Sequence, residues 1–372
     1  MIRVAFVAPS LNGGGAERAA VTVLNALDPG AYTKALYLFR REGPYLQDVS
    51  SGVELVAAAA DDRVGRVRLL SAFLASWRPQ IVVSFLSYFS VFVAMRLARS
   101  RARFVINQQT PLSAFLTDRD YAWRAPVRRQ AFEAVARFVY PRASVVATSR
   151  GVGDDLVSRF GVGRDRLATI PNPAALEAIA RAAAEPVELP GPAGAPVIAT
   201  AGRLAEAKNW PLFVESLRRL RADQPFRAIV LGAGELEAEI RRRVADADLE
   251  AQVTLAGFQS NPWKYMARAD VFALTSHYEG FGNVLIEAMA CGAPVVATAS
   301  PGTRDIVQPE TNGLLVEAHE PGAVASALRR VLSDRAFRER LRLGARATAQ
   351  AYDVPAIAAS YDRFFRKLAA TA

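Results

Sequence analysis

The chain has 372 residues, of which 51% are hydrophobic and 22% charged, with a formal net charge of +10. This length suggests two domains that each bury a core, and the composition excludes a disordered chain. A single cysteine excludes a disulfide framework and favours the reducing cytosol.

The positive charge lies in the first half of the chain. Residues 1–170 hold 23 Lys and Arg and 13 Asp and Glu, whereas residues 171–372 hold 23 of each. A one-sided basic surface suits anionic phospholipid, a polyprenyl diphosphate or nucleic acid.

Strand-like runs alternate with helix-like runs from the first residues onward. The N-terminal run is typical of a buried strand that leads into a glycine loop, not of a signal peptide. The alternation predicts a first domain at 1–170 with a parallel α/β sheet and right-handed crossovers. The expected strands are Arg3–Ala8, Lys34–Phe39, Glu54–Ala57, Ile81–Leu86, Arg103–Asn107, Ser144–Thr148 and Leu167–Ile170.

A second series of strands follows a stretch rich in Pro, Ala, Gly and Glu, which predicts a linker at 171–195. The second doubly wound domain is expected at 196–353, and residues 354–372 place apolar side chains at helical spacing. The longest apolar region, Ile81 to Met95, is shorter than the ~20 residues that a spanning helix needs. The strands expected here are Val197–Ala201, Arg227–Leu231, Val253–Leu255, Val271–Thr275, Pro294–Ala297 and Gly313–Val316.

One candidate loop follows the first strand of each predicted domain, at the carboxyl ends of the strands where doubly wound sheets bind ligands. The first contains Gly13, Gly14 and Gly15, which let the backbone approach a ligand closely, although such a loop is more often only a tight turn. In the second, Arg203 and Lys208 directly follow a buried strand. They are either phosphate-binding cations or solvated loop charges.

The stretch Ser276–Gly292 combines a buried strand end, a glycine-rich loop and a short helix. Asn283 is the expected N-cap, so free N–H groups near Gly282 would face a phosphate. Glu287 interrupts an apolar helix, where a buried carboxylate needs hydrogen-bond donors that ligand hydroxyls would supply. The plainer alternatives place Glu287 at the rim and leave Glu279 as a solvated loop charge.

Together, Glu279-Gly280-Phe281-Gly282 through Glu287 and the following Ala290–Thr298 closely resemble the Glu-x7-Glu signature of family 4 retaining glycosyltransferases. This resemblance implies the GT-B architecture, two Rossmann-like domains facing each other across a cleft, with the acceptor on the first domain and the nucleotide sugar on the second. The final helix would cross back onto the first domain.

The resemblance also implies roles for individual residues. Glu287 would bind the ribose hydroxyls and Glu279 the sugar hydroxyls, while backbone near Phe258 would contact the base, unless Phe258 is plain core. Arg203 and Lys208 would stabilise the leaving diphosphate, with Glu279 as the third residue at the reacting centre. The glycine loop would close on the diphosphate or position the acceptor. The remaining donor contacts would come from Gly280, Phe281, Gly282, Asn283 and Val284.

We expect no cofactor and no metal. The two histidines, His277 and His319, lie far apart in the sequence, and Asp246-Ala247-Asp248 is better explained as part of a solvated helix face. Many relatives carry a histidine near the acceptor, whereas this chain has Asn107, Gln108 and Gln109 there. These amides could bind hydroxyls but could not take a proton at neutral pH.

A basic, aromatic region precedes the end of the first domain. On a helix from Pro126 to Tyr140, one apolar stripe would hold Ala131, Phe132, Val135 and Val139 and leave the arginines largely off it. The region is either a packed helix with a solvated face or a dock for anionic lipid. It contains Arg119, Arg124, Arg128, Arg129, Arg137 and Arg142, interleaved with Phe115, Tyr121, Trp123, Phe132, Phe138 and Tyr140.

These observations predict a metal-independent transferase that moves a hexose or N-acetylhexosamine to a glycan or polyprenyl-diphosphate-linked acceptor. The resemblance to bacterial enzymes of lipid-linked glycan assembly favours a UDP-sugar over GDP-mannose. It also favours a cytoplasmic protein at the inner face of the membrane. The alternative is a non-catalytic binder of anionic membrane or nucleic acid, which would explain the charge but not the two glutamates.

Overall fold

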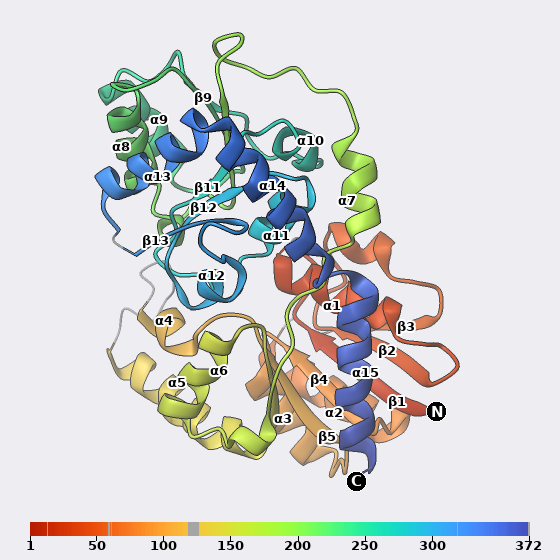
Figure 1. The fold of residues 1–372 in the computed structure, drawn as a ribbon. Helices are drawn as coiled ribbons and strands as arrows, with labels where there is room; N and C mark the ends of the chain where they lie inside the picture. Colours follow the sequence, from red (N-terminus) through yellow and green to blue (C-terminus); the bar gives the residue numbers. More distant parts are fainter. Residues whose placement is uncertain (13, 59, 61, 118–125, 318, 371–372) are drawn as a thin grey trace. The chain divides into compact units, whose positions relative to one another are not determined.

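The computed structural model describes the chain except for residues 13, 59, 61, 118–125, 318 and 371–372. The described residues form two compact units. One holds those up to Pro173 together with the segment from Val354, and the other holds Ala174–Asp353. Each unit is built on one parallel sheet (Figure 1).

The sheet of the first unit has the order β3-β2-β1-β4-β5-β6-β7, with every pairing parallel. Its strands are β1 Ile2–Ala8, β2 Tyr32–Leu38, β3 Val53–Ala57, β4 Ile81–Phe85, β5 Arg103–Gln108, β6 Ser144–Ala147 and β7 Leu167–Thr169. Its α-helices are α1 Gly15–Ala26, α2 Arg63–Trp77, α3 Tyr88–Leu97, α4 Leu112–Thr117, α5 Pro126–Val139, α6 Arg150–Phe160 and α15 Val354–Ala370. Short 3-10 helices are η1 Pro44–Asp48, η3 Tyr140–Arg142 and η4 Arg164–Arg166.

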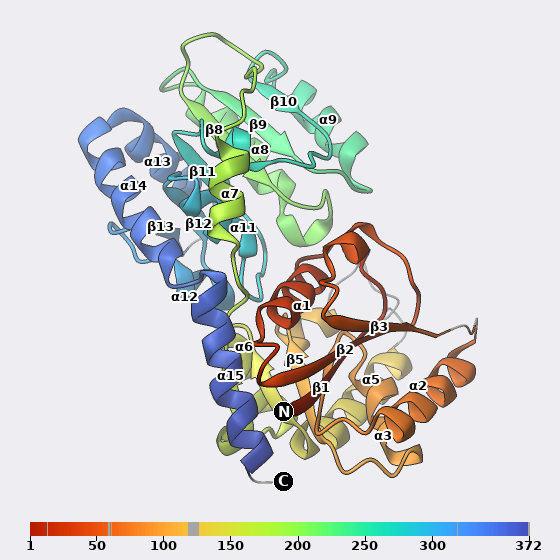
Figure 2. The same ribbon diagram turned by 90° about the vertical axis from the view of Figure 1, so that its right-hand side faces the viewer.

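Alternate residues of β1 face opposite layers of this unit, as the period of two along a strand requires. Phe6 packs with α1 and α15, whereas Val7 packs on the side that α2, α3 and α5 cover (Figure 2). Helix α15 contributes Phe365, whose ring meets Phe6 edge-on at a centroid distance of 6.3 Å. The C-terminal helix is therefore part of the core of the first unit.

The sheet of the second unit has the order β10-β9-β8-β11-β12-β13, again with parallel pairings. Helices α8, α9 and α13 cover one face, and α7, α10 and α11 cover the other (Figure 1). The strands are β8 Val197–Ala201, β9 Arg227–Leu231, β10 Val253–Leu255, β11 Val271–Leu274, β12 Val295–Thr298 and β13 Gly313–Val316. The helices are α7 Leu176–Ala183, η5 Glu206–Lys208, α8 Trp210–Leu220, α9 Glu237–Asp246, α10 Trp263–Met266, α11 Asn283–Ala290, α12 Pro301–Ile306, α13 Pro321–Ser333 and α14 Arg335–Gln350.

The predicted fold class, two Rossmann-like sheets of the GT-B type, is confirmed, and each predicted strand is present with ends that differ by at most two residues. The segment predicted as a linker, 171–195, is different, because it contains helix α7. Ile179 and Ala183 are buried on that helix against the second sheet. The high Ala and Glu content concealed an amphipathic helix in what looked like a Pro-rich connection.

No helix in the described part of the chain combines the length and the hydropathy that a membrane crossing requires.

Candidate functional site

The loops that follow β8, β9 and β10 are joined by backbone hydrogen bonds at the carboxyl edge of the second sheet. The Leu204 N–H donates to Ala233 O at 3.0 Å, and the Gly232 N–H donates to Gly257 O at 2.8 Å. A Cβ on Gly232 would lie 1.9 Å from the carbonyl oxygen of Gly202. The strand order reverses between β8 and β11. Doubly wound sheets bind ligands at the carboxyl ends of the strands next to such a reversal.

An ion pair joins the loop after β8 to the loop after β11. Lys208 Nζ donates to Glu279 Oε1 at 2.6 Å, and the Ser276 hydroxyl donates to the same oxygen at 2.6 Å. The two charged side chains are only 21% and 13% exposed. Neither is a solvated loop charge, so the plainer alternatives for Glu279 and Lys208 are wrong. The side chain of Arg203, in contrast, is exposed.

Glu287 lies in the buried face of α11, with 7% of its surface exposed. Trp263 of α10 donates its indole N–H to Glu287 Oε2 at 3.0 Å. The alternative that places this carboxylate at the rim is therefore wrong. One of the hydrogen bonds that we expected a ligand hydroxyl to donate to Glu287 is donated by Trp263 instead. Burial and the Glu287 charge raise the pKa of the neighbouring Cys291 thiol to about 12.

The sequence did not point to Trp263. Its only signal is that a buried indole N–H usually finds an acceptor. The partner lies 24 residues away on another helix, so that only the fold could identify it.

The start of α11 differs from the prediction by one position. The cap is Gly282, with φ 92°, and Asn283 is the first helical residue. Glycine is favoured there because the chain turns through the left-handed region. The Phe281 side chain is buried in the core, which leaves its backbone as the part that a ligand could reach.

Helix α12 packs against the loop that carries Glu279. The Gly302 N–H donates to Glu279 O at 3.0 Å. A Cβ on Gly302 would lie 2.6 Å from backbone atoms of Gly280 and Phe281. The loop that carries Glu279 is thus held from both sides, and the partly buried Val284 follows at the start of α11.

Phe258 is 77% exposed in the loop after β10, so the alternative that it is plain core is wrong. Gly257 before it has φ 69°, and a Cβ added to this glycine would meet no atom of the described residues within 4 Å, which leaves the loop open on that side. The contact between this loop and a nucleobase remains a prediction.

The predicted glycine loop belongs to the first unit. Gly13 lies outside the described residues, Gly14 caps α1 and Gly15 begins it. The Glu17 carboxylate folds back over Gly14, and burial raises its pKa. The role of this loop in closing on a ligand stays a prediction.

The two histidines, separated by 41 residues in the sequence, lie together in the structure. Their rings stack at a centroid distance of 6.3 Å, because His277 follows β11 and His319 follows β13 at the same edge of the sheet. Burial and the nearby His319 lower the pKa of His277. Their separation along the sequence therefore did not indicate their proximity in space. No group of three metal-binding side chains occurs among the residues that the structure describes.

The amides that stand at the expected position of the acceptor-side histidine form a buried network in the first unit. Asn107 donates to the hydroxyl of Tyr361 on α15 at 2.6 Å, and the Tyr140 hydroxyl donates to Gln108 Oε1. Gln109 exchanges hydrogen bonds with Asn172. Asn107 is 2% exposed, whereas Gln108 and Gln109 are partly exposed, and the binding of hydroxyls by these amides stays a prediction.

The basic helix is present as α5, but its apolar stripe is shifted. Ala131 is exposed and Ala136 is buried, whereas Phe132, Val135 and Val139 face the core as predicted. Arg128 and Arg129 are exposed. Arg137 pairs with Glu133, and Arg142 lies over the ring of Phe138. Four residues of the predicted basic region, Arg119, Tyr121, Trp123 and Arg124, lie outside the described residues.

Asp246 and Asp248 are exposed at the end of α9, as expected for a solvated helix face.

Comparison with known proteins gives two family matches. Residues 183–348 match the family described as Glycosyl transferases group 1, and residues 4–173 match the Glycosyl transferase 4-like domain. A Campylobacter jejuni protein, N-acetylgalactosamine-N,N'-diacetylbacillosaminyl-diphospho-undecaprenol 4-alpha-N-acetylgalactosaminyltransferase, is 31% identical over 265 residues. The match covers 71% of this chain and 69% of the relative.

Two further similarities extend over nearly the whole chain. A lipopolysaccharide core biosynthesis glycosyltransferase of Rhizobium meliloti is 27% identical over 338 residues, which cover 89% of this chain and 88% of the relative. A solved Anabaena structure in complex with UDP and glucose has a TM-score of 0.80 and 20% identity, and the match covers 98% of this chain and 100% of that one.

Proposed function

The chain belongs to the Glycosyl transferases group 1 family, and from this membership we propose that it is a retaining, metal-independent hexosyltransferase. It transfers a hexose or N-acetylhexosamine from a nucleotide diphosphate sugar to a hydroxyl of a glycan or polyprenyl-diphosphate-linked acceptor. The Campylobacter relative, whose name specifies an undecaprenyl-diphosphate-linked acceptor, supports this class of acceptor.

The proposal is carried by two observations at the carboxyl ends of the second sheet: the buried carboxylate of Glu287 and the Lys208–Glu279 ion pair. In this assignment Glu287 accepts hydrogen bonds from the ribose hydroxyls, and Lys208 exchanges its partner Glu279 for the diphosphate. Glu279 is then released to accept from the sugar hydroxyls. The Ser276 hydroxyl, which donates to Glu279 Oε1, keeps a hydrogen bond on this carboxylate while Lys208 changes partner.

The proposed reaction depends on the stabilisation of negative charge on the leaving diphosphate. The bond between the anomeric carbon and the diphosphate oxygen breaks, and the acceptor oxygen bonds to that carbon on the same face. The acceptor's proton passes to the departing diphosphate oxygen. Arg203, Lys208 and the N–H groups near Gly282–Val284 stabilise the negative charge that develops on the leaving group.

A UDP-sugar is the favoured donor, since a structural neighbour binds UDP and glucose, and GDP-mannose is the alternative. The basic first half of the chain would hold the enzyme peripherally at an anionic membrane surface. A non-catalytic binder of nucleic acid or membrane is the rival function.

Nucleotide-dependent thermal stabilisation tests the proposal. In the presence of EDTA, UDP at about 100 times its Kd should stabilise the protein by roughly 2.7 kcal/mol. For a unit of this size that is a rise in Tm of about 5–10 °C. Glu287→Gln should abolish the rise, because the amide is uncharged and accepts hydrogen bonds through one oxygen only, whereas the carboxylate accepts through both.

The matched control is Glu250→Gln, an exposed glutamate before β10, which should keep the full rise. If neither UDP nor GDP changes the Tm of the wild-type protein, the transferase assignment is wrong. A panel of nucleotide sugars assayed for hydrolysis and transfer then identifies the donor.

A further inference from the structure

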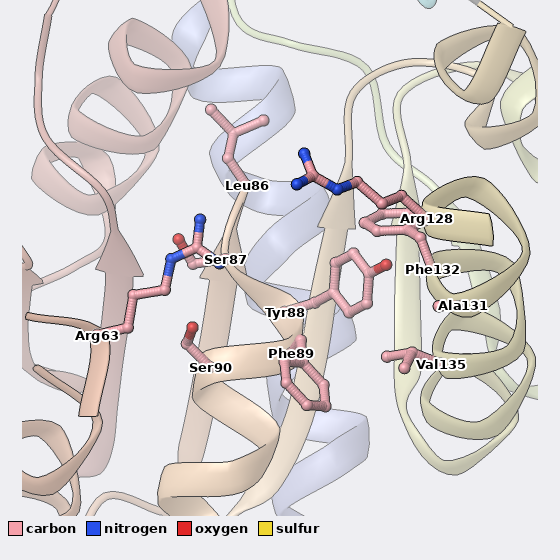
Figure 3. A pocket seen from close by; sticks show the side chains of 10 residues that line it. All are labelled: Arg63, Leu86, Ser87, Tyr88, Phe89, Ser90, Arg128, Ala131, Phe132 and Val135. Atoms are coloured by element: carbon pink, nitrogen blue, oxygen red, sulfur yellow. The ribbon is translucent and has the colours of Figure 1, made fainter. Parts of the chain in front are cut away.

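A pocket of about 520 Å³ lies in the first unit, between the β4–α3 turn, the start of α2 and the side of α5 (Figure 3). The order of the first sheet reverses between β1 and β4. The residues Leu86 and Ser87 directly follow β4, so the pocket opens at the carboxyl edge of that reversal. This is the place where a doubly wound sheet binds ligands, and the volume is in the range of small-molecule sites.

Two arginines face this pocket from opposite sides. Arg63, the first residue of α2, and Arg128 of α5 both extend toward the space beside Leu86 and Ser87 (Figure 3). Both side chains are exposed, and neither has a hydrogen-bond or ion-pair partner among the residues that the structure describes. The described lining of the pocket contains no carboxylate. Two cations in one concave site favour a ligand with a concentrated negative charge.

Much of the remaining wall is apolar, and two of its side chains are exposed. Leu86 adopts a left-handed backbone conformation, with φ 60°, that a bulky side chain rarely takes, and 55% of its surface is exposed. Phe89 at the start of α3 is 51% exposed, and Phe132 and Val135 continue the wall from α5. A strained backbone that holds an apolar side chain in solvent is characteristic of a functional site.

We propose that this pocket binds the diphosphate and the first isoprenyl units of a polyprenyl-diphosphate-linked acceptor. This inference deepens the proposed function and rests on it for the identity of the acceptor. Arg63 and Arg128 hold the diphosphate oxygens through charge-assisted hydrogen bonds. Leu86, Phe89 and Val135 contact the branched hydrocarbon that adjoins the diphosphate.

The chemistry of the lining distinguishes this occupant from others. A glycan would need many neutral donors and acceptors, whereas besides the two cations the wall offers mainly hydrocarbon, with only the hydroxyls of Ser87, Tyr88 and Ser90 among its side chains. A flat bilayer surface would need no concave site. A ligand with an anionic head directly attached to a branched hydrocarbon uses both parts of the pocket.

Isothermal titration calorimetry with three probes tests the proposal: farnesyl diphosphate, inorganic pyrophosphate and farnesol. Farnesyl diphosphate should bind at least about tenfold more tightly than either of the other two, because only this probe uses both the cations and the apolar wall. Arg63→Gln and Arg128→Gln should each weaken its binding by about tenfold. Phe89→Ser should weaken the binding of farnesyl diphosphate but leave the binding of pyrophosphate unchanged.

Arg129→Gln is the matched control, since Arg129 neighbours Arg128 on α5 but does not line the pocket. Its binding of farnesyl diphosphate should stay within about twofold of the wild type. If Arg129→Gln weakens binding as much as Arg128→Gln, or if pyrophosphate binds as tightly as farnesyl diphosphate, the pocket is not the site. Binding to phosphatidylglycerol vesicles without binding of farnesyl diphosphate would also overturn the proposal, in favour of a general membrane surface.

The UDP-dependent rise in Tm, measured on the same variants, separates the two proposals and reports folding. A UDP response without farnesyl diphosphate binding contradicts only the pocket. Farnesyl diphosphate binding without a response to UDP or GDP contradicts only the transferase assignment.

Discussion

At the scale of single residues, the carboxyl edge of the second sheet collects titratable side chains that are far apart in the chain. Glu279 is neutralised by Lys208, and Glu287 is held by Trp263. His277 and His319 stack at the same edge. Parallel strands bring these groups together because their carboxyl ends all lie on one side of the sheet.

The histidine pair gives a pH-dependent prediction. The pKa of His277 is below its ordinary 6.5, chiefly through burial and then through His319, while Glu206 acts in the opposite direction. The unfolded chain therefore binds more protons than the folded one below about pH 6.5, and stability falls as the pH falls through that range. His319→Gln should raise the pKa of His277 and make this loss of stability shallower.

The measurement is a proton NMR titration, which is simple because the chain has only two histidines. It is paired with urea unfolding at pH 7, 6 and 5. A His277 pKa that does not move in the His319→Gln variant would show that the two rings do not interact.

At the scale of elements, helix α15 is fixed to the first sheet by both packing and a polar bond. Its buried face carries Ile357, Tyr361 and Phe365 at the spacing of a helix stripe. The hydroxyl of Tyr361 accepts from Asn107, which is almost fully buried at the end of β5. Asn107, at the position where the family resemblance led us to expect a histidine, thus anchors the last helix.

Removal of that bond should destabilise the first unit. Tyr361→Phe leaves the buried Asn107 amide without its acceptor, so the free energy of unfolding should fall by about 1–3 kcal/mol. Chemical denaturation of the full-length protein measures it. Arg363→Gln, at an exposed position of the same helix, should change stability by less than about 0.5 kcal/mol. Equal effects of the two substitutions would mean that the Tyr361–Asn107 bond contributes nothing.

At the scale of the whole molecule, the two units differ in charge and in the chemistry of their sites. The excess of basic residues lies in residues 1–170, together with the pocket between Arg63 and Arg128. The paired glutamates and the rigid loops lie in Ala174–Asp353. In the proposed function, this division corresponds to a donor nucleotide on the second unit and an anionic lipid acceptor on the first.

Hydrogen exchange with and without UDP tests that division. UDP should slow exchange in the loops after β8, β9 and β11, since a bound ligand suppresses local opening of the segments that it contacts. The β4–α3 turn should exchange at an unchanged rate. Farnesyl diphosphate should give the converse pattern. Protection by UDP that is confined to the first unit would place the donor site in the wrong half of the chain.

The sequence by itself determined the two parallel sheets, the strand positions and the Glu279–Glu287 signature, because these depend on local periodicity and on spacing along the chain. Helix α7 was missed, since its stripe is short and lies in a stretch that is rich in alanine and proline. Only the tertiary structure decided which side chains interact. It showed the hydrogen bond from Trp263 to Glu287 and the ion pair of Lys208 with Glu279. It also showed the hydrogen bond from Asn107 to Tyr361 and the stacking of the two histidines. Each of these depends on which side chains the folded strands and helices bring within a few ångströms, and spacing along the chain does not encode that distance.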